Sequence, residues 1–143
     1  MGRKNRPIPS ELFCDASFLI AYFATQDREH AKAMKIRERL QGRGVRLYSS
    51  WPIFSEASTL LLYHYGYSHS MALLQSLSAF HCVIPSEADY YKASALFGEF
   101  NRDQRLSFND LLVYVLIRGN LRGMPVITFD RDFAKIGLTL FRP

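Results

Sequence analysis

Cysteine and histidine are scarce in this chain of 143 residues, which holds two cysteines and four histidines. Cys14 and Cys82 each lie in an apolar run and lack metal-ligand spacing, so we expect buried, reduced thiols and neither a zinc site nor a disulfide framework. The histidines show no ligand pairing either. Reduced thiols are consistent with a cytoplasmic location, which we expect for this protein.

Long hydrophobic runs are also missing. Every apolar run is well short of the roughly 18 residues that a membrane span requires, so we expect no membrane association. The charged segment 1–6 is not followed by an apolar stretch of the length found in signal peptides, so no such signal is expected. Internal repeats and low-complexity segments are absent as well. These absences favour an ordinary globular protein.

The composition is that of a basic globular domain. Hydrophobic residues make up 48% of the chain, and 18 Lys and Arg residues stand against 13 Asp and Glu residues, which gives a formal net charge of +5. We expect a single domain over residues 11–143 and a flexible basic arm over residues 1–10, which carry two prolines. A basic balance permits a polyanionic partner such as nucleic acid without requiring one.

Short apolar runs alternate with longer helical patterns along the chain. Strands are expected at residues 12–14, 45–49, 81–85, 126–129 and 138–141. Strands that alternate with helices are typical of a parallel sheet covered on both faces. The predicted fold class is therefore α/β, a three-layer α/β/α sandwich with a short parallel five-stranded sheet.

The segment 106–133 organises the chain. Residues 111–117 are apolar apart from one tyrosine hydroxyl, which predicts a helix buried nearly all round. Asp110 stands at the start of this helix, and Asp130 follows the strand expected at 126–129. A helix packed on a parallel sheet runs antiparallel to the next strand, so both acids should lie at the carboxyl edge of the sheet. Open α/β sheets bind ligands at that edge.

Two further acids are predicted to reach the same edge. Asp15 follows the first strand, where it is expected either to cap the next helix or to join a site. Glu56 shares a helix face with Ile53, Ala57 and Leu60. A carboxylate that points toward the core requires an ion-pair partner, such as a nearby arginine, or a metal ion.

Four converging carboxylates would raise one another's pKa values unless a cation compensates their charge. Oxygen-only ligands without clustered His or Cys favour Mg²⁺ or Mn²⁺ over Zn²⁺. A metal ion would also let an acidic site accept a phosphodiester, and cations around the rim would bind neighbouring phosphates. The pattern predicts metal-dependent cleavage of nucleic acid.

The motifs around these acids resemble those of PIN-domain ribonucleases, and most closely the VapC-type toxins of toxin–antitoxin pairs. The resemblance runs from Leu12 onward and rests on the segments 15–17, 55–56, 106–110 and 128–133. It implies a Mg²⁺- or Mn²⁺-dependent endoribonuclease, usually a homodimer, that is inhibited by a cognate antitoxin protein. By position, the implied site residues are the acidic quartet Asp15, Glu56, Asp110 and Asp130, the additional candidate Asp132, and the supporting hydroxyls of Ser17 and Thr128. Asn109 is assigned no role.

Two alternatives remain at this level. The first is a non-catalytic PIN-fold module that binds RNA or protein. Such a module would be recognised by the loss of one of the four acids, and this sequence has all four. The second is a phospho-aspartyl enzyme or receiver domain. A dehalogenase-type phosphotransferase would carry a second acid two residues after Asp15, where this chain has Ser17.

Overall fold

The computed structural model describes residues 7–142 and contains a four-stranded sheet. The strands are β1 (Glu11–Cys14), β2 (Arg46–Ser50), β3 (His81–Val83) and β4 (Val126–Ile127). They are arranged in the order β3-β2-β1-β4, and each neighbouring pair is parallel. The parallel sheet that the alternating pattern predicted is therefore confirmed.

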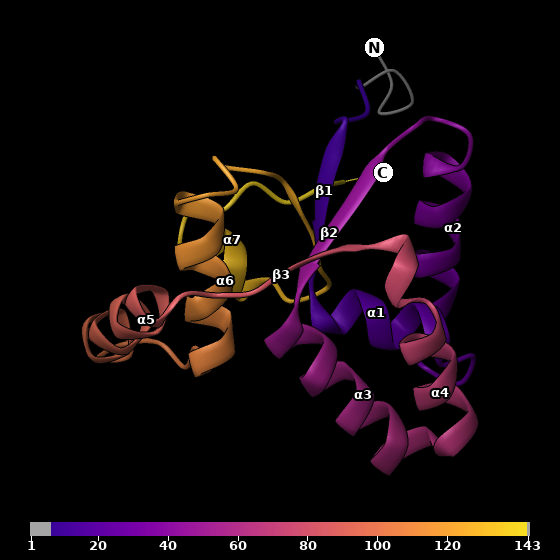
Figure 1. Cartoon of the computed structure of the whole chain (residues 1–143), viewed down its shortest axis with the longest axis horizontal. Coiled ribbons are helices and arrows are strands. Elements are labelled where there is room, and N and C mark those ends of the chain that lie inside the picture. Colours follow the sequence, from indigo (N-terminus) through magenta and orange to yellow (C-terminus); the bar gives the residue numbers. More distant parts are fainter. Residues whose placement is uncertain (1–6, 143) are drawn as a thin grey trace.

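Helices connect the strands and cover the sheet. In chain order they are α1 (Ala16–Phe23), α2 (His30–Leu40), α3 (Trp51–Tyr65), α4 (Tyr67–Gln75), the 3₁₀ helix η2 (Leu77–Ala79), α5 (Glu87–Phe100), α6 (Phe108–Arg118) and α7 (Asp132–Lys135). Figure 1 shows α2 on one side of β1 and β2 and α6 with α7 on the other, which is the predicted three-layer arrangement. The α3–α4 hairpin extends beyond the end of the sheet.

The prediction of a fifth strand at 138–141 was wrong. Only Leu140 pairs, through a single parallel bridge to Val126. The Val126 amide donates to Thr139 O, and the Phe141 amide donates to Val126 O. The fourth strand is also shorter than expected and ends at Ile127. Because β4 is only two residues long, it offers few backbone groups with which a fifth strand could pair.

The core lies between the sheet and the helices. In α6, six of the seven residues in 111–117 are buried and only Tyr114 is partly exposed, which confirms the predicted all-round burial. Leu12 and Phe13 of β1 have no exposed surface, and Val126 and Ile127 of β4 are at most 1% exposed. Apolar burial of this extent is the main force that holds the layers together.

The strand order places a topological switch point between β1 and β4. The chain moves from β1 to β2 and β3 in one direction and then returns to β4 on the opposite side of β1. Ligands of open α/β sheets bind beyond the carboxyl ends of the strands at such a point. Asp15 directly follows β1, and Asp130 lies three residues beyond the end of β4.

Two predictions concern other parts of the chain. The basic arm expected at residues 1–10 falls mostly outside the described residues, although Ser10 O accepts a 2.9 Å hydrogen bond from the Arg46 amide. Over the described part, no helix is both long enough and apolar enough to cross a membrane.

Candidate active site

Asp15 is the buried acid of the site, with only 5% of its surface exposed. It occupies the N-cap position of α1 in extended conformation, but its side chain makes no capping hydrogen bond. Its carboxylate instead accepts hydrogen bonds from Thr128 Oγ1 at 2.8 Å and from Ser17 Oγ at 3.1 Å. The position predicted for either a cap or a site residue is therefore occupied by a carboxylate that faces the end of β4.

Ser17 and Thr128 join the ends of β1 and β4. Their hydroxyl oxygens lie 3.1 Å apart, and Ser17 Oγ also accepts the Phe129 amide at 3.0 Å. Thr128 Oγ1 accepts the Asp130 amide at 3.0 Å. These bonds fix the segment that carries Asp130 next to Asp15.

Asp110 lies in the first turn of α6, directly after Phe108 and Asn109. Its amide donates to Ser107 Oγ at 3.0 Å, and its Oδ2 accepts the Ser107 amide at 2.9 Å. This reciprocal pair is a capping box, which satisfies two backbone donors that a helix start otherwise leaves unpaired. Asp110 therefore has a structural role in addition to its place among the acids.

Glu56 lies on α3 and is half-buried. Its Oε2 accepts a hydrogen bond from Asn109 Nδ2 at 3.5 Å. Glu56 forms no ion pair within residues 7–142, so the arginine partner considered for a core-facing glutamate is not present there. Sequence reasoning gave Asn109 no role, because nothing in the sequence indicates that the start of α6 faces α3.

Asp130 and Asp132 occupy the turn between β4 and α7. Asp130 Oδ1 accepts the Asp132 amide at 2.9 Å, and Asp132 Oδ1 forms a 3.0 Å ion pair with Lys135. Asp132 is thus already partly neutralised by a lysine. Asp130 borders two surface hollows and carries no such ion pair in the described part of the chain.

The charge of Asp110 acts on the pKa values of two other acids, and two further acids act on the pKa of Asp110 itself. Burial raises the pKa of the Asp15 carboxyl to about 6, hydrogen bonds from Thr128 and Ser17 oppose that rise, and the charge of Asp110 adds to it. Burial also raises the pKa of Glu56. The hydrogen bond from Asn109 lowers it, and the charge of Asp110 adds to the rise. The structure therefore brings all four predicted acids, and Asp132, to one edge of the sheet.

The pKa of Asp110 itself is raised, first by burial. Hydrogen bonds with Ser107 oppose the rise, and the charges of Asp130 and Asp132 add to it. Carboxylates that raise one another's pKa values bind protons or cations more readily than isolated ones do.

Cations surround the Asp130 side of this acid cluster. One hollow of about 420 Å³ is lined by Ser17, Asp130, Arg28 and Arg131 among others. A second, of about 240 Å³, adds Lys32, Lys35 and Arg142. All five cations are exposed, and two of them, Arg28 and Lys32, form ion pairs with Glu29, which lines both hollows. Acid cluster and basic rim are therefore adjacent, in a protein of net charge +5.

The donor chemistry fits a hard divalent cation. The converging side chains offer only oxygen ligands, of the kind that Mg²⁺ and Mn²⁺ prefer. Among the His, Cys, Asp and Glu residues of the described chain, however, no group of three or more is positioned so that it could hold a metal ion. The acids are close enough to Asp110 for its charge to affect them, but they do not form a complete set of metal ligands.

Comparisons with known proteins agree with this architecture. The chain is similar to Mycobacterium tuberculosis VapC20, described as a sarcin–ricin loop cleaving toxin, with 20% identity and a TM-score of 0.81 over 92% of this chain and 99% of the other. It is also similar to a chain of VapBC2 from Rickettsia felis, solved bound to a fragment of its promoter DNA, with 14% identity and a TM-score of 0.67 over 92% and 97% of the two chains. No curated protein matches the sequence.

The similarity at these identities concerns the fold. The sequence itself matches the model of the PIN domain family over residues 12–138, a range that contains every acid of the cluster. The chain therefore belongs to the PIN domain family.

Proposed function

We propose that this protein is a metal-dependent endoribonuclease and the toxin of a toxin–antitoxin pair. The observation that carries the proposal is the cluster of acids at the switch point, where burial, with a smaller contribution from the charge of Asp110, raises the pKa of both Asp15 and Glu56. Such a concentration of negative charge is costly in a folded protein unless it serves to bind a cation.

The proposed metal ligands are Asp15, Glu56, Asp110 and Asp130, with Asp132 as an additional candidate. A bound Mg²⁺ or Mn²⁺ supplies positive charge to the phosphodiester and makes water a better nucleophile. Ser17 and Thr128 hold the Asp15 carboxylate in place through their hydroxyls. Asn109 orients Glu56.

The basic rim supports RNA as the substrate. Arg28, Lys32, Lys35 and Arg131 border the hollows beside Asp130. Their charges are placed to bind phosphates on either side of the one that is cleaved, and such contacts make binding strongly dependent on salt. The carboxylates alone would repel the RNA backbone.

The role as a toxin rests on the neighbours that share the fold. One is described as a toxin that cleaves the sarcin–ricin loop, and the other belongs to a VapBC pair. By analogy with them, we propose an antitoxin protein as partner, a homodimer as assembly and the cytoplasm as location.

The test is incubation of the purified protein with total RNA from its source organism. The reaction is run with Mn²⁺, with chelator, and with the Asp110→Asn variant. Discrete fragments that require both the metal ion and Asp110 are the expected result. Full cleavage by folded Asp110→Asn protein would refute the proposal. Expression of the wild-type chain in bacteria should stop growth, and the variant should not.

The second candidate is a non-catalytic PIN module that binds RNA or protein. One observation favours it: the described residues contain no group arranged to hold a metal ion. An RNA pool that stays intact with folded, partner-free protein at any Mn²⁺ concentration would support this candidate. Titration calorimetry with Mn²⁺ decides the matter independently, because the module would show no binding.

A further inference from the structure

An aromatic pair joins the first turns of α5 and α6, and its α6 member directly precedes residues of the acid cluster in the sequence. Phe108 is followed by Asn109, which donates to Glu56, and by Asp110. The Phe108 ring stacks against Tyr90 of α5 with the two planes only 17° apart and the centroids 6.3 Å apart. Each of the two side chains is 39% exposed. The pair therefore presents an aromatic surface to solvent beside the site.

This surface is held in place by two well-formed helix starts. Ser86 and Asp89 form a capping box at the start of α5, and Ser107 and Asp110 form the same motif at the start of α6. Asn101 bonds the Leu106 backbone at both its amide and its carbonyl, at 2.7 and 2.9 Å. The rings are thus carried on fixed backbone, which lowers the entropy cost of binding a flat ligand against them.

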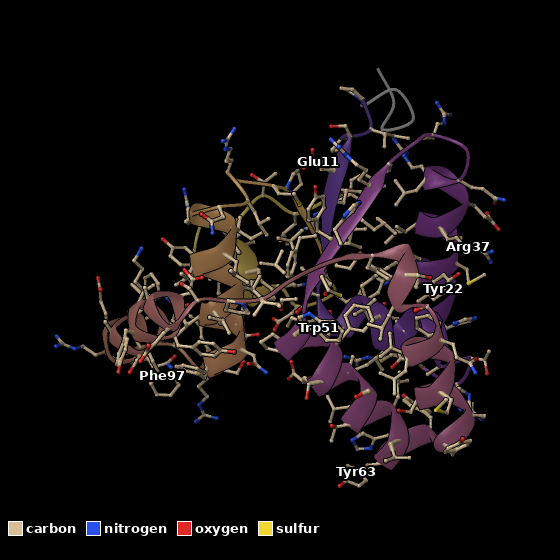
Figure 2. All side chains as sticks on the ribbon, viewed as in Figure 1. Glu11, Tyr22, Arg37, Trp51, Tyr63 and Phe97 are labelled. Carbon is tan, nitrogen blue, oxygen red and sulfur yellow. The ribbon has the colours of Figure 1, made fainter. Side chains whose placement is uncertain are left out.

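The surroundings of the pair match a nucleic acid strand. Arg102 and Arg105 are exposed in the connection that leads into Phe108, with one exposed acid, Asp103, between them. A third aromatic residue, Trp51, is 46% exposed and begins α3 directly after β2, at the sheet end shown in Figure 2. Aromatic surfaces flanked by cations bind single-stranded nucleic acids, because every base offers a flat π-face.

We propose that Phe108 and Tyr90 form a stacking platform for an unpaired base of the RNA substrate, next to the phosphate that is cleaved. The inference rests on the proposed ribonuclease function and adds to it a binding surface for one base, made of two side chains outside the acid cluster. A base inside an A-form duplex is stacked on its neighbours and offers no free face to the platform. The basic rim borders Asp130, beyond the end of β4, and the platform lies at the start of α6, so different elements carry the contacts for phosphates and for a base.

Binding of two labelled RNA strands by fluorescence anisotropy tests this assignment. Chelator is present so that no strand is cut. One strand is single-stranded RNA of mixed sequence, and the other has the same length and number of phosphates but carries abasic sites throughout. Wild-type protein should prefer the strand with bases. Equal affinity for the two strands would overturn the platform.

Amino-acid substitutions test which side chains produce the preference for the strand with bases. Phe108→Leu keeps an apolar side chain and removes the aromatic face, and Tyr90→Ala removes the second ring. Each should weaken binding of the strand with bases by about 5- to 100-fold and leave binding of the abasic strand unchanged. Phe108→Trp should restore the preference. Unchanged binding in Phe108→Leu would refute the role of that ring.

The matched control is Tyr63→Ala, which removes an aromatic residue that is 78% exposed near the far end of α3. Figure 2 shows Tyr63 at the tip of the α3–α4 hairpin, remote from Trp51. This variant should bind both strands like the wild type. A loss equal to that of Phe108→Leu would show that exposed aromatic residues attract RNA without a specific platform, and would overturn the proposal.

Two further outcomes separate this proposal from the function on which it rests. If wild-type protein cleaves RNA and Phe108→Leu cleaves and binds it equally well, the platform fails and the nuclease stands. If no RNA is cleaved but the base preference depends on Phe108, the platform stands and the nuclease fails. A change of oligomeric state in Phe108→Leu by size-exclusion chromatography, without loss of base preference, would assign the surface to self-association instead.

Discussion

Thr128 Oγ1 donates a 2.8 Å hydrogen bond to Asp15 Oδ2, across 113 positions of sequence. The same hydroxyl oxygen accepts the Asp130 amide. One small side chain thus connects an acid that follows β1 with an acid that follows β4. Because these two strands are neighbours only in the folded sheet, the contact exists only when the switch point has formed.

Thr128→Val removes this hydroxyl at nearly constant volume. We expect the free energy of unfolding to fall by about 1–3 kcal/mol, because a buried carboxylate and a backbone amide each lose a partner. RNA cleavage should fall by about 10- to 100-fold. Urea unfolding and a cleavage assay measure the two effects. The control is Thr59→Val, which removes an exposed hydroxyl that donates to Ser55 O, and an equal effect there would contradict the prediction.

The two capping boxes allow a matched test of Asp110. Ser86→Ala and Ser107→Ala each remove a hydroxyl that caps a helix with the same geometry. Both variants should lose about 1 kcal/mol of stability in thermal unfolding. Only Ser107→Ala should also lose cleavage activity, because its helix start carries Asp110 and Asn109. Equal activity in the two variants would show that the Ser107 cap is not needed to position Asp110 and Asn109 for cleavage.

Asn109→Ala tests the residue that sequence reasoning passed over. The variant removes the 3.5 Å hydrogen bond to Glu56, so cleavage should fall by about tenfold while the thermal midpoint changes little. The comparison is Asn120→Ala, an exposed asparagine in the turn after α6. Unchanged cleavage in Asn109→Ala would remove it from the site.

Stability should depend on pH through Asp15. Its folded pKa, about 6, lies above its ordinary value of 3.8. The folded state therefore binds more protons than the unfolded chain between about pH 4 and pH 6, so the contribution of Asp15 to stability falls as pH rises through that window. Asp15→Asn should unfold later than wild type at neutral pH, by on the order of 2 kcal/mol in metal-free buffer. Urea titrations with chelator at acid and neutral pH measure it. A pH slope as steep in the variant as in wild type would disprove this assignment.

Divalent metal should stabilise the folded state. A ligand at 100 times its dissociation constant adds about 2.7 kcal/mol to the free energy of unfolding, which corresponds to a rise of several degrees in Tm. Mn²⁺ should produce this rise in wild type and not in Asp110→Asn, with sodium chloride of equal ionic strength as the reference. The same rise in both proteins would show that the metal binds elsewhere.

Local patterns predicted much of the fold because their causes are local. The apolar residues of 111–117 require burial on every side, and the folded α6 provides it. Strand and helix alternation was sufficient to predict a parallel sheet with both faces covered. The prediction of a fifth strand failed because a strand needs a partner with free backbone groups. The two residues of β4 provide only the single bridge to Leu140.

The sequence by itself determined which carboxylates follow strands or begin helices, and therefore which acids reach the carboxyl edge. Only the tertiary structure decided how those acids are held. Asp15 bonds Thr128 as well as Ser17 of the helix it precedes, Asn109 bonds Glu56, and Phe108 stacks on Tyr90. The contacts of Asp15 with Thr128 and of Asn109 with Glu56 join elements far apart in the chain, and the contact of Phe108 with Tyr90 joins two consecutive helices. Their distances follow from how the elements pack in the folded chain, a property that no local pattern encodes.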